Sequence, residues 1–79
     1  MHFVYLLEST HCPSRKYVGN TDNVDRRLSE HNFGESIHTN KFKPWKLMTC
    51  IAFDTASKAQ IFEIYLKSHS GRAFAKKHL

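Results

Sequence analysis

The chain has 79 residues, so residues 1–79 are expected to form a single small domain with no room for a second. Hydrophobic residues make up 41% of the chain and aromatic residues 13%, which is enough for one compact core and too much for a disordered tail. No apolar run approaches the roughly 20 residues of a membrane span, and the beginning of the chain lacks the features of a signal peptide. Composition therefore excludes a membrane protein and predicts a cytoplasmic one.

Positive charge is in excess and is unevenly distributed. Lys and Arg number 12 against 7 Asp and Glu, which gives a net charge of +5 with histidine neutral. Only lysines carry charge between Ser36 and Phe53, and no acid follows Glu63. This pattern favours a polyanionic partner such as nucleic acid, and solubility is the alternative explanation.

Cysteine and histidine do not indicate a structural metal site. The chain has two cysteines and six histidines, with no Cys-x-x-Cys pair and no histidine spacing typical of zinc ligands. In a reducing cytoplasm we expect both thiols to be free. We expect a monomer.

Two short strands are predicted at the beginning of the chain. Residues Phe3–Leu7 are apolar on both faces, which is typical of a central strand. Residues Lys16–Asn20 form the second strand, after a polar loop of about seven residues. Such a loop is too short for a parallel crossover, so the two strands are expected to pair antiparallel.

A helix follows, and its phase selects one of two adjacent arginines. Asp22 is the expected N-cap. Val24 and Leu28 are the only large apolar residues of the helix, so they must face the core. Arg27 lies on that inward stripe together with His31, whereas Arg26 points the opposite way, into water. The helix ends at Asn32 and Gly34.

The remaining elements are a third strand and two helices. A basic loop over 35–46 leads to a strand over Trp45–Phe53. A helix over Ala56–Ser68 has apolar residues around most of its circumference, which predicts that it is substantially buried, and Ser57 with Gln60 has the spacing of a capping box. Ser70 caps a short helix over Gly71–Lys77. The predicted fold class is α+β, with a three-stranded antiparallel sheet flanked by helices in the order strand, strand, helix, strand, helix, helix.

Five polar side chains from two predicted strands and two predicted helices are expected to meet at one surface. Their chemistry suits phosphodiester hydrolysis, because arginine offers paired donors to phosphate oxygens and a tyrosine or histidine accepts a proton from water. A lone carboxylate holds one divalent cation with waters completing its shell. Each residue also has an ordinary structural explanation, such as strand packing or a helix ion pair. The five are Tyr5, Tyr17, Arg27, His31 and Glu63.

An ordered set of short motifs resembles the GIY-YIG nuclease superfamily. Phe3-Val4-Tyr5 and Tyr17-Val18-Gly19 match its paired motif, and the likeness continues through Arg27, His31 and Glu63. It also includes Trp45-Lys46-Leu47, Tyr65-Leu66-Lys67-Ser68 and Ser70-Gly71-Arg72, so it covers nearly the whole chain. The sequence is most similar to the small stand-alone bacterial members, which resemble the nuclease domain of excinuclease C.

The resemblance implies a role for each of the five residues and a cofactor. It implies that Tyr5 and Tyr17 are the motif tyrosines, that Arg27 is the catalytic arginine, and that His31 occupies a tyrosine-or-histidine position. Glu63 is the implied ligand of one divalent cation, Mg²⁺ or Mn²⁺. Which of the two tyrosines and the histidine serves as general base is left open. Two positions depart from the family pattern, with Phe3 in place of glycine and Asn20 where some relatives carry lysine.

The expected function is a metal-dependent endonuclease that hydrolyses nucleic-acid phosphodiesters, with DNA favoured over RNA as the substrate and DNA repair as a plausible setting. The alternative is a nucleic-acid-binding module with little or no cleavage. In both cases binding is assigned to a set of basic side chains on the loop and near the end of the chain, some of which are expected beside Tyr17 and Arg27. These are Lys41, Lys43, Lys46, Lys67, Arg72, Lys76 and Lys77.

Overall fold

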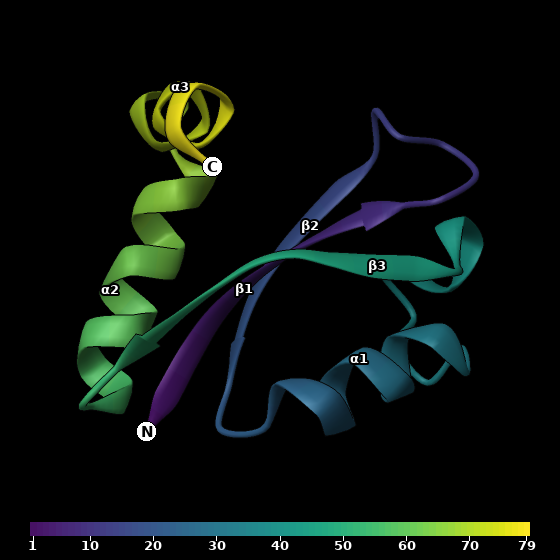
Figure 1. Ribbon diagram of the computed structural model, residues 1–79, viewed down its shortest axis with the longest axis horizontal. Coiled ribbons are helices and arrows are strands. Elements are labelled where there is room, and N and C mark those ends of the chain that lie inside the picture. Colours follow the sequence, from purple (N-terminus) through teal and green to yellow (C-terminus); the bar gives the residue numbers. More distant parts are fainter.

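The structure is a computed structural model that describes residues 1–79, and it confirms the predicted α+β class and element order (Figure 1). A three-residue 3₁₀ turn in the loop before the third strand is the one addition. The elements are β1 (His2–Ser9), β2 (Lys16–Thr21), α1 (Val24–Asn32), η1 (Asn40–Phe42), β3 (Trp45–Phe53), α2 (Ala56–Lys67) and α3 (His69–His78).

The sheet is antiparallel with the strand order β2-β1-β3. β1 is the central strand, as its apolar run predicts, and its residues from Val4 to Leu7 are all buried. Tyr5 lies opposite Gly19 of β2 and Cys50 of β3. The register with β3 shifts between Leu6 and Leu7, which marks a β-bulge. β2 and β3 are the edges of the sheet.

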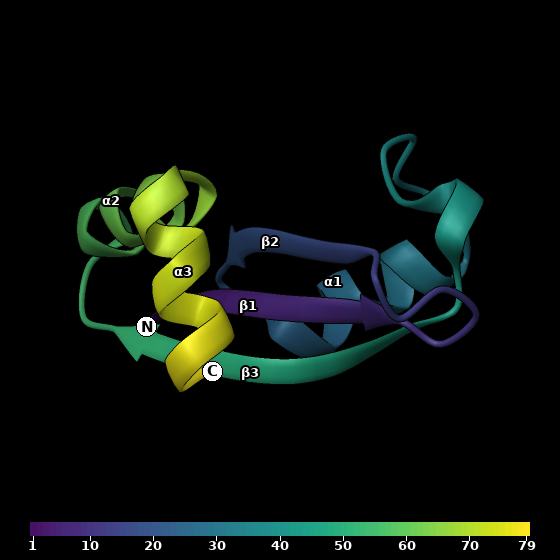
Figure 2. The same ribbon diagram turned by 90° about the horizontal axis from the view of Figure 1, so that it is seen from above.

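Helices cover the two faces of the sheet, with α1 on one side and α2 and α3 on the other (Figure 2). Because side chains alternate along a strand, β1 contributes to two separate cores. Val4 and Leu6 pack against Ala59 and Leu66 of α2. On the other face, Tyr5, Leu7 and Trp45 form a cluster against which two residues of α1 pack, Val24 and Leu28. The apolar stripe of α1 therefore faces the sheet as predicted.

The first helix is capped one residue later than predicted. Asn23, not Asp22, is the N-cap of α1, because its backbone is extended and its side chain accepts the backbone N–H of Arg26. Asp22 instead accepts a hydrogen bond from the Arg26 guanidinium at 2.9 Å.

Two other predicted caps are wrong because Ser57 and Ser70 lie inside their helices, whereas a capping side chain lies just outside. Thr55 caps α2 by accepting the N–H of Lys58, so there is no capping box at Ser57. Ser68 caps α3 by accepting the N–H of Gly71, so α3 begins at His69 rather than after Ser70.

The prediction that α2 is substantially buried is wrong. Ala59 and Leu66 are buried, but Ile61 and Ile64 are 68% and 62% exposed. A single helix on a three-stranded sheet buries only the face that meets the strands, and α3 packs beside α2 through Phe74. None of the helices has the length and apolar character needed to cross a membrane.

Candidate active site beside the edge strand

Both motif tyrosines and His31 come together on the face of the sheet that α1 covers. Tyr5 lies opposite Gly19, and Tyr17 is two residues before Gly19 on the same face, so the two tyrosine rings are diagonal neighbours with centroids 6.2 Å apart. His31, in the last turn of α1, packs its ring edge against Tyr17 at a centroid distance of 4.8 Å. The predicted meeting of these three residues is therefore observed.

Tyr5 and His31 form a buried hydrogen-bonded pair. The Tyr5 hydroxyl lies 3.0 Å from Nε2 of His31, and Nδ1 of His31 lies 2.7 Å from the hydroxyl of Thr39. Tyr5 is 2% exposed and His31 is 0% exposed, whereas Tyr17 is only partly buried. Of the three rings, Tyr17 is the one that an approaching substrate can touch.

Burial is the largest cause of the shifted pKa values of Tyr5 and His31. Burial and then the neighbouring Tyr17 raise the pKa of Tyr5 to about 12, while contact with the Arg27 guanidinium opposes the increase. The pKa of His31 is lowered, first by burial and then by the charge of Arg27. At neutral pH Tyr5 is therefore a phenol and His31 a neutral imidazole.

This lowered pKa predicts an acid-sensitive fold. As the pH falls below the ordinary histidine pKa of 6.5, the unfolded chain binds a proton at His31 that the folded chain does not, so the free energy of unfolding decreases. Urea unfolding of the parent and of His31→Gln from pH 7 to about pH 5 measures this difference. The lowered pKa of Glu30 acts only below about 4.5, outside that window. Equal pH dependence of the two proteins would contradict a neutral buried His31.

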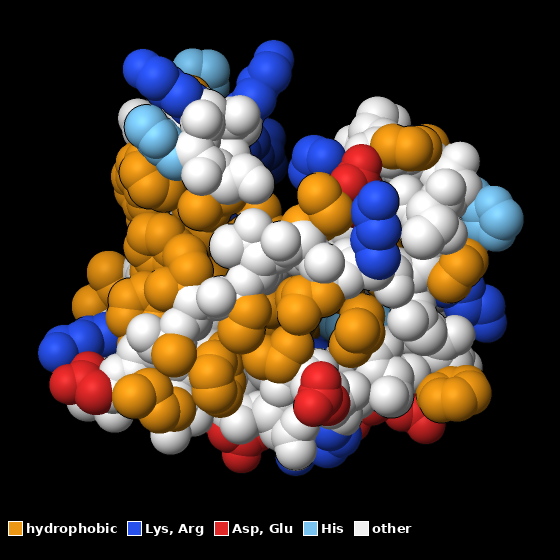
Figure 3. Space-filling model, in the orientation of Figure 1, with side chains coloured by type: hydrophobic (Ala, Val, Ile, Leu, Met, Phe, Trp, Pro, Cys, Tyr) orange, Lys and Arg blue, Asp and Glu red, His pale blue; other side chains and the backbone are white.

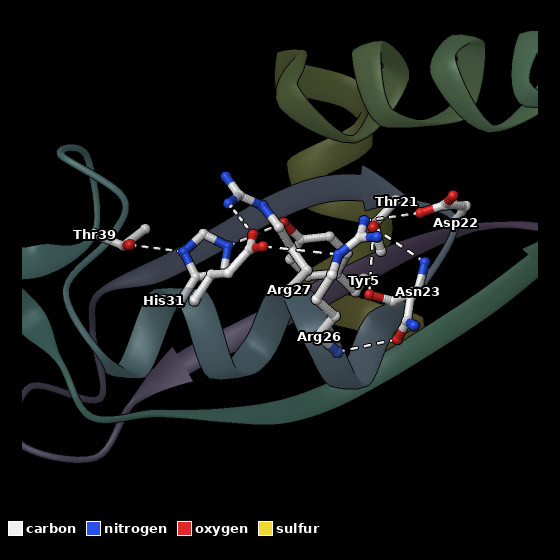
Figure 4. A network of polar contacts seen from close by, with 9 residues as sticks. Tyr5, Thr21, Asp22, Asn23, Arg26, Arg27, His31 and Thr39 are labelled. Atoms are coloured by element: carbon white, nitrogen blue, oxygen red, sulfur yellow. Dashed lines mark hydrogen bonds and ion pairs between the residues drawn. The ribbon is translucent and has the colours of Figure 1, made fainter.

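The side chain of Arg27 is less exposed than that of Arg26, as the helix phase predicts, and Figure 4 shows the two guanidinium groups pointing in different directions. The Arg27 guanidinium donates to Oε1 of Glu30 at 2.7 Å. Its side chain is 31% exposed, so it is anchored on one side and open on the other. The side chain of Arg26 is 55% exposed and pairs with Asp22 at 2.9 Å and with Oε2 of Glu30 at 3.7 Å.

Glu63 approaches from α2, on the opposite face of the sheet. Asn20 of β2 donates a hydrogen bond from Nδ2 to Oε1 of Glu63, and Lys67 donates to Oε2 at 2.8 Å. Because β2 is an edge strand, Glu63 and Tyr17 lie on the two sides of a single strand. Sequence reasoning noted Asn20 only as a departure from the family and missed its contact with Glu63.

Glu63 suits a weakly held cation and not a preformed metal centre. Its side chain is 15% exposed, and no cluster of three His, Cys, Asp or Glu residues surrounds it. A divalent cation bound to this single carboxylate takes most of its ligands from water and substrate. Binding also requires that the Lys67 ammonium be displaced from Oε2.

A basic groove of about 1130 Å³ runs between the sheet and α3. Figure 3 shows the molecule hollowed beside α3, with Lys and Arg side chains around the hollow. Tyr17 lines the groove, and Leu6, Val18 and Leu66 contribute to its apolar surface. No acidic residue lines it, and its cations are Arg15, Lys16, Lys67, Arg72 and Lys76.

The groove contains some of the predicted binding residues and not others. Lys67, Arg72 and Lys76 line it together with Tyr17, whereas four predicted cations do not: Lys41, Lys43, Lys46 and Lys77. Lys41 lies over the ring of Phe42, and Lys43 lies close to Gly34 at the end of α1. Sequence reasoning missed Arg15 and Lys16, although their position directly before Tyr17 is a signal that was available.

Gly19 is required by the close approach of Tyr5. A β-carbon at position 19 would lie 2.4 Å from the Tyr5 hydroxyl oxygen and 2.6 Å from its ring carbon Cζ. We predict that Gly19→Ala lowers the free energy of unfolding by about 1–3 kcal/mol and displaces Tyr5 from His31. A strand alanine that fitted without a clash would instead stabilise by about 0.5–1 kcal/mol. Urea unfolding determines the sign, and a stabilised variant would contradict the packing described.

Comparison with known proteins points to one family. The family model described as the GIY-YIG catalytic domain matches residues 1–77. A UPF0213 protein of Cupriavidus necator is 38% identical over 76 residues, covering 91% of this chain and 80% of that protein. The solution NMR structure of a UPF0213 protein of Bacillus halodurans, at 32% identity, covers 95% of this chain and 79% of its own, with a TM-score of 0.56.

A second group of relatives is much longer. The structure-specific endonuclease subunit SLX1 of Podospora anserina is 36% identical over 69 residues, covering 80% of this chain. The chain spans about a fifth of the length of that protein and of SLX1 of Debaryomyces hansenii.

Proposed function

Since this chain belongs to the GIY-YIG catalytic domain family, we propose that it is a metal-dependent endonuclease that hydrolyses phosphodiester bonds in nucleic acid, with DNA the first candidate. The observation that carries the proposal is the position of Tyr17. Its ring packs against the buried His31, and Tyr17 is among the residues that line the basic groove. A phosphate backbone bound in the groove would therefore pass next to Tyr17.

Each accessible side chain has a distinct part in this reaction. Arg27 donates to the oxygens of the scissile phosphate, because its guanidinium is held by Glu30 and is still partly exposed. Tyr17 first loses its hydroxyl proton to solvent and then, as the phenolate, accepts a proton from the attacking water. Tyr5 and His31 do not touch substrate in this scheme, since both are buried. Their rings pack against Tyr17 and hold it in place.

Glu63 is the proposed ligand of one divalent cation, Mg²⁺ or Mn²⁺. When bound, such an ion supplies positive charge to the phosphate and to the leaving oxygen. Asn20 holds one carboxylate oxygen of Glu63, and the other oxygen, which accepts from Lys67, would hold the ion. Lys67 also lines the groove, where it would bind a backbone phosphate.

The second candidate is a module that binds nucleic acid without cutting it, and the groove favours this candidate as much as the first. The two functions differ in the chemistry that follows binding. Labelled single-stranded DNA, duplex DNA and RNA should be incubated with the chain in Mg²⁺, in Mn²⁺ and in chelator. We expect strand cleavage only with metal. Binding without cleavage of any of these substrates would establish the module and overturn the nuclease.

Binding should depend on salt through the cations of the groove. If three to five of them neutralise phosphates, log K falls with log salt at a slope of about −2 to −4. Replacing Arg72 and Lys76 by alanine should weaken binding to all sequences alike and reduce the magnitude of the slope by about 1.5. The matched control is the double replacement of Lys41 and Lys43, which do not line the groove. Equal effects of the two double variants would place the nucleic acid elsewhere.

A further inference from the structure

Arg15 is a groove cation whose guanidinium is held by an aromatic ring. Its Cζ lies 4.7 Å from the centroid of the Phe42 ring, which is the geometry of a cation–π contact. No carboxylate pairs with Arg15, whereas Lys16 and Lys67 of the same groove each lie close to an acid. The proposed reaction gives this stacked pair no part.

Hydrogen bonds from Ser9 hold both members of the stacked pair. The backbone N–H of Ser9 donates to the carbonyl oxygen of Arg15 at 3.0 Å, and its hydroxyl donates to the carbonyl oxygen of Phe42 at 2.7 Å. Ser9 is the last residue of β1 and is buried. The end of the central strand therefore holds the loop that carries Arg15 against the turn that carries Phe42, and the stack forms before any ligand binds.

The stack leaves the hydrogen-bonding edge of the guanidinium free. A cation–π contact uses the flat face of the group, while its N–H donors point outward in the same plane. Two of these donors, side by side, match two oxygens of a phosphate. Arg15 is exposed, so its donor edge is accessible. The Lys41 ammonium lies farther from the ring, at 5.7 Å, and has no such planar pair of donors.

The stacked pair lies on the side of the sheet that carries the candidate active site. The bond from Ser9 extends the β1–β2 ladder to Arg15, and strand side chains two residues apart share a face. Arg15 and Tyr17 therefore lie on one side of β2, with about 7 Å between their α-carbons. Phe42 and Tyr17 also pack against the same buried cluster. Because Arg15 lines the groove as well, it connects the groove with Tyr17.

We propose that Arg15, oriented by Phe42, is a binding site for a phosphate next to the one that is cleaved. The ligand is a phosphodiester backbone, an identity that rests on the proposed function, whereas an anion site at Arg15 does not. This site determines the register of the backbone as it leaves the groove and passes Tyr17. Arg72 and Lys76 also line the groove, but no ring or carboxylate orients them, so they contribute charge without register.

Variants that conserve charge separate an oriented guanidinium from a simple positive charge. Arg15→Lys keeps the charge and loses the stacked pair of donors, and Phe42→Leu keeps every charge and removes the ring. We expect each to weaken binding of one labelled DNA, in chelator and at fixed salt, by about two- to fivefold, the effect of an exposed cation–π contact. The losses should not add in the double variant, because both remove the same contact.

Arg72→Lys is the matched control, because it makes the same exchange at a groove arginine that has no ring partner. It should change binding little. Phe42 also packs in the core, so Arg15→Lys, at an exposed position, decides the question if Phe42→Leu does not fold. An Arg15→Lys variant that binds as tightly as the parent, or an Arg72→Lys variant that loses as much, would overturn the inference and leave the nuclease standing.

A second measurement needs neither DNA nor cleavage. NMR of ¹⁵N-arginine-labelled protein follows the Nε–H signals during titration with inorganic phosphate, and Arg15→Lys and Arg72→Lys assign their signals. We expect a larger shift at Arg15 than at Arg72 in the parent, and no such preference in Phe42→Leu. Equal shifts at the two arginines of the parent would overturn the inference. A parent that shows the preference but binds no nucleic acid would refute the proposed function and still support an anion site at Arg15.

Discussion

Replacing Arg27 by alanine is expected to lower the cleavage rate at saturating substrate by about 10²-fold or more, the general effect of losing one preorganised donor to a transition state. The guanidinium is held before substrate arrives, because Glu30 accepts from Nη1 at 2.7 Å. The donor is therefore already oriented when negative charge develops on the phosphate. Binding should weaken much less than the rate, since the groove cations remain.

Arg26→Ala is the matched control for this prediction. The two arginines are adjacent in the chain and carry the same charge, but Arg26 is more exposed, pairs with Asp22 and makes only a longer contact of 3.7 Å with Glu30. An exposed pair of this kind contributes little to stability, so the variant should fold and cut as the parent does. Steady-state and single-turnover cleavage of the same labelled DNA compares the two variants. A larger loss for Arg26→Ala would mean that the phosphate is bound on the outer face of α1.

Much of the fold was predictable because local patterns and tertiary packing agree. The continuous apolar run of β1 indicates a strand buried on both faces, and it is the centre of the sheet. The stripe of Val24 and Leu28 correctly oriented Arg27 toward the sheet. The helix caps were predicted wrongly where two or more polar residues adjoin the start of a helix. The choice between Asp22 and Asn23, for example, depends on backbone angles that composition does not determine. The burial of α2 was predicted wrongly because an apolar sequence does not reveal how little of the sheet is available to cover the helix.

The sequence predicted that three of the candidate site residues, Tyr5, Tyr17 and His31, lie together, but it could not show which rings are buried and which is accessible. That distinction depends on how α1 closes over the sheet. Nor could it find Thr39 or Asn20, because a lone threonine or asparagine in a polar segment has no pattern that points to a distant partner. The groove cations were partly missed for a similar reason, as Arg15 and Lys16 join Arg72 and Lys76 only through the packing of α3 beside the sheet.

The most direct measurement compares the parent with Glu63→Gln for binding and for metal-dependent cleavage of one labelled DNA. Glutamine keeps an amide oxygen as an acceptor, and the i,i+4 ion pair with Lys67 that it removes contributes only about 0.2–0.5 kcal/mol, so the fold should be preserved. The variant loses the carboxylate charge that a divalent cation requires. We predict that Glu63→Gln binds the DNA at least as tightly as the parent and produces no detectable cleavage in Mg²⁺ or Mn²⁺. Cleavage by Glu63→Gln at the parent rate would show that the reaction does not depend on this carboxylate and would contradict the proposed site.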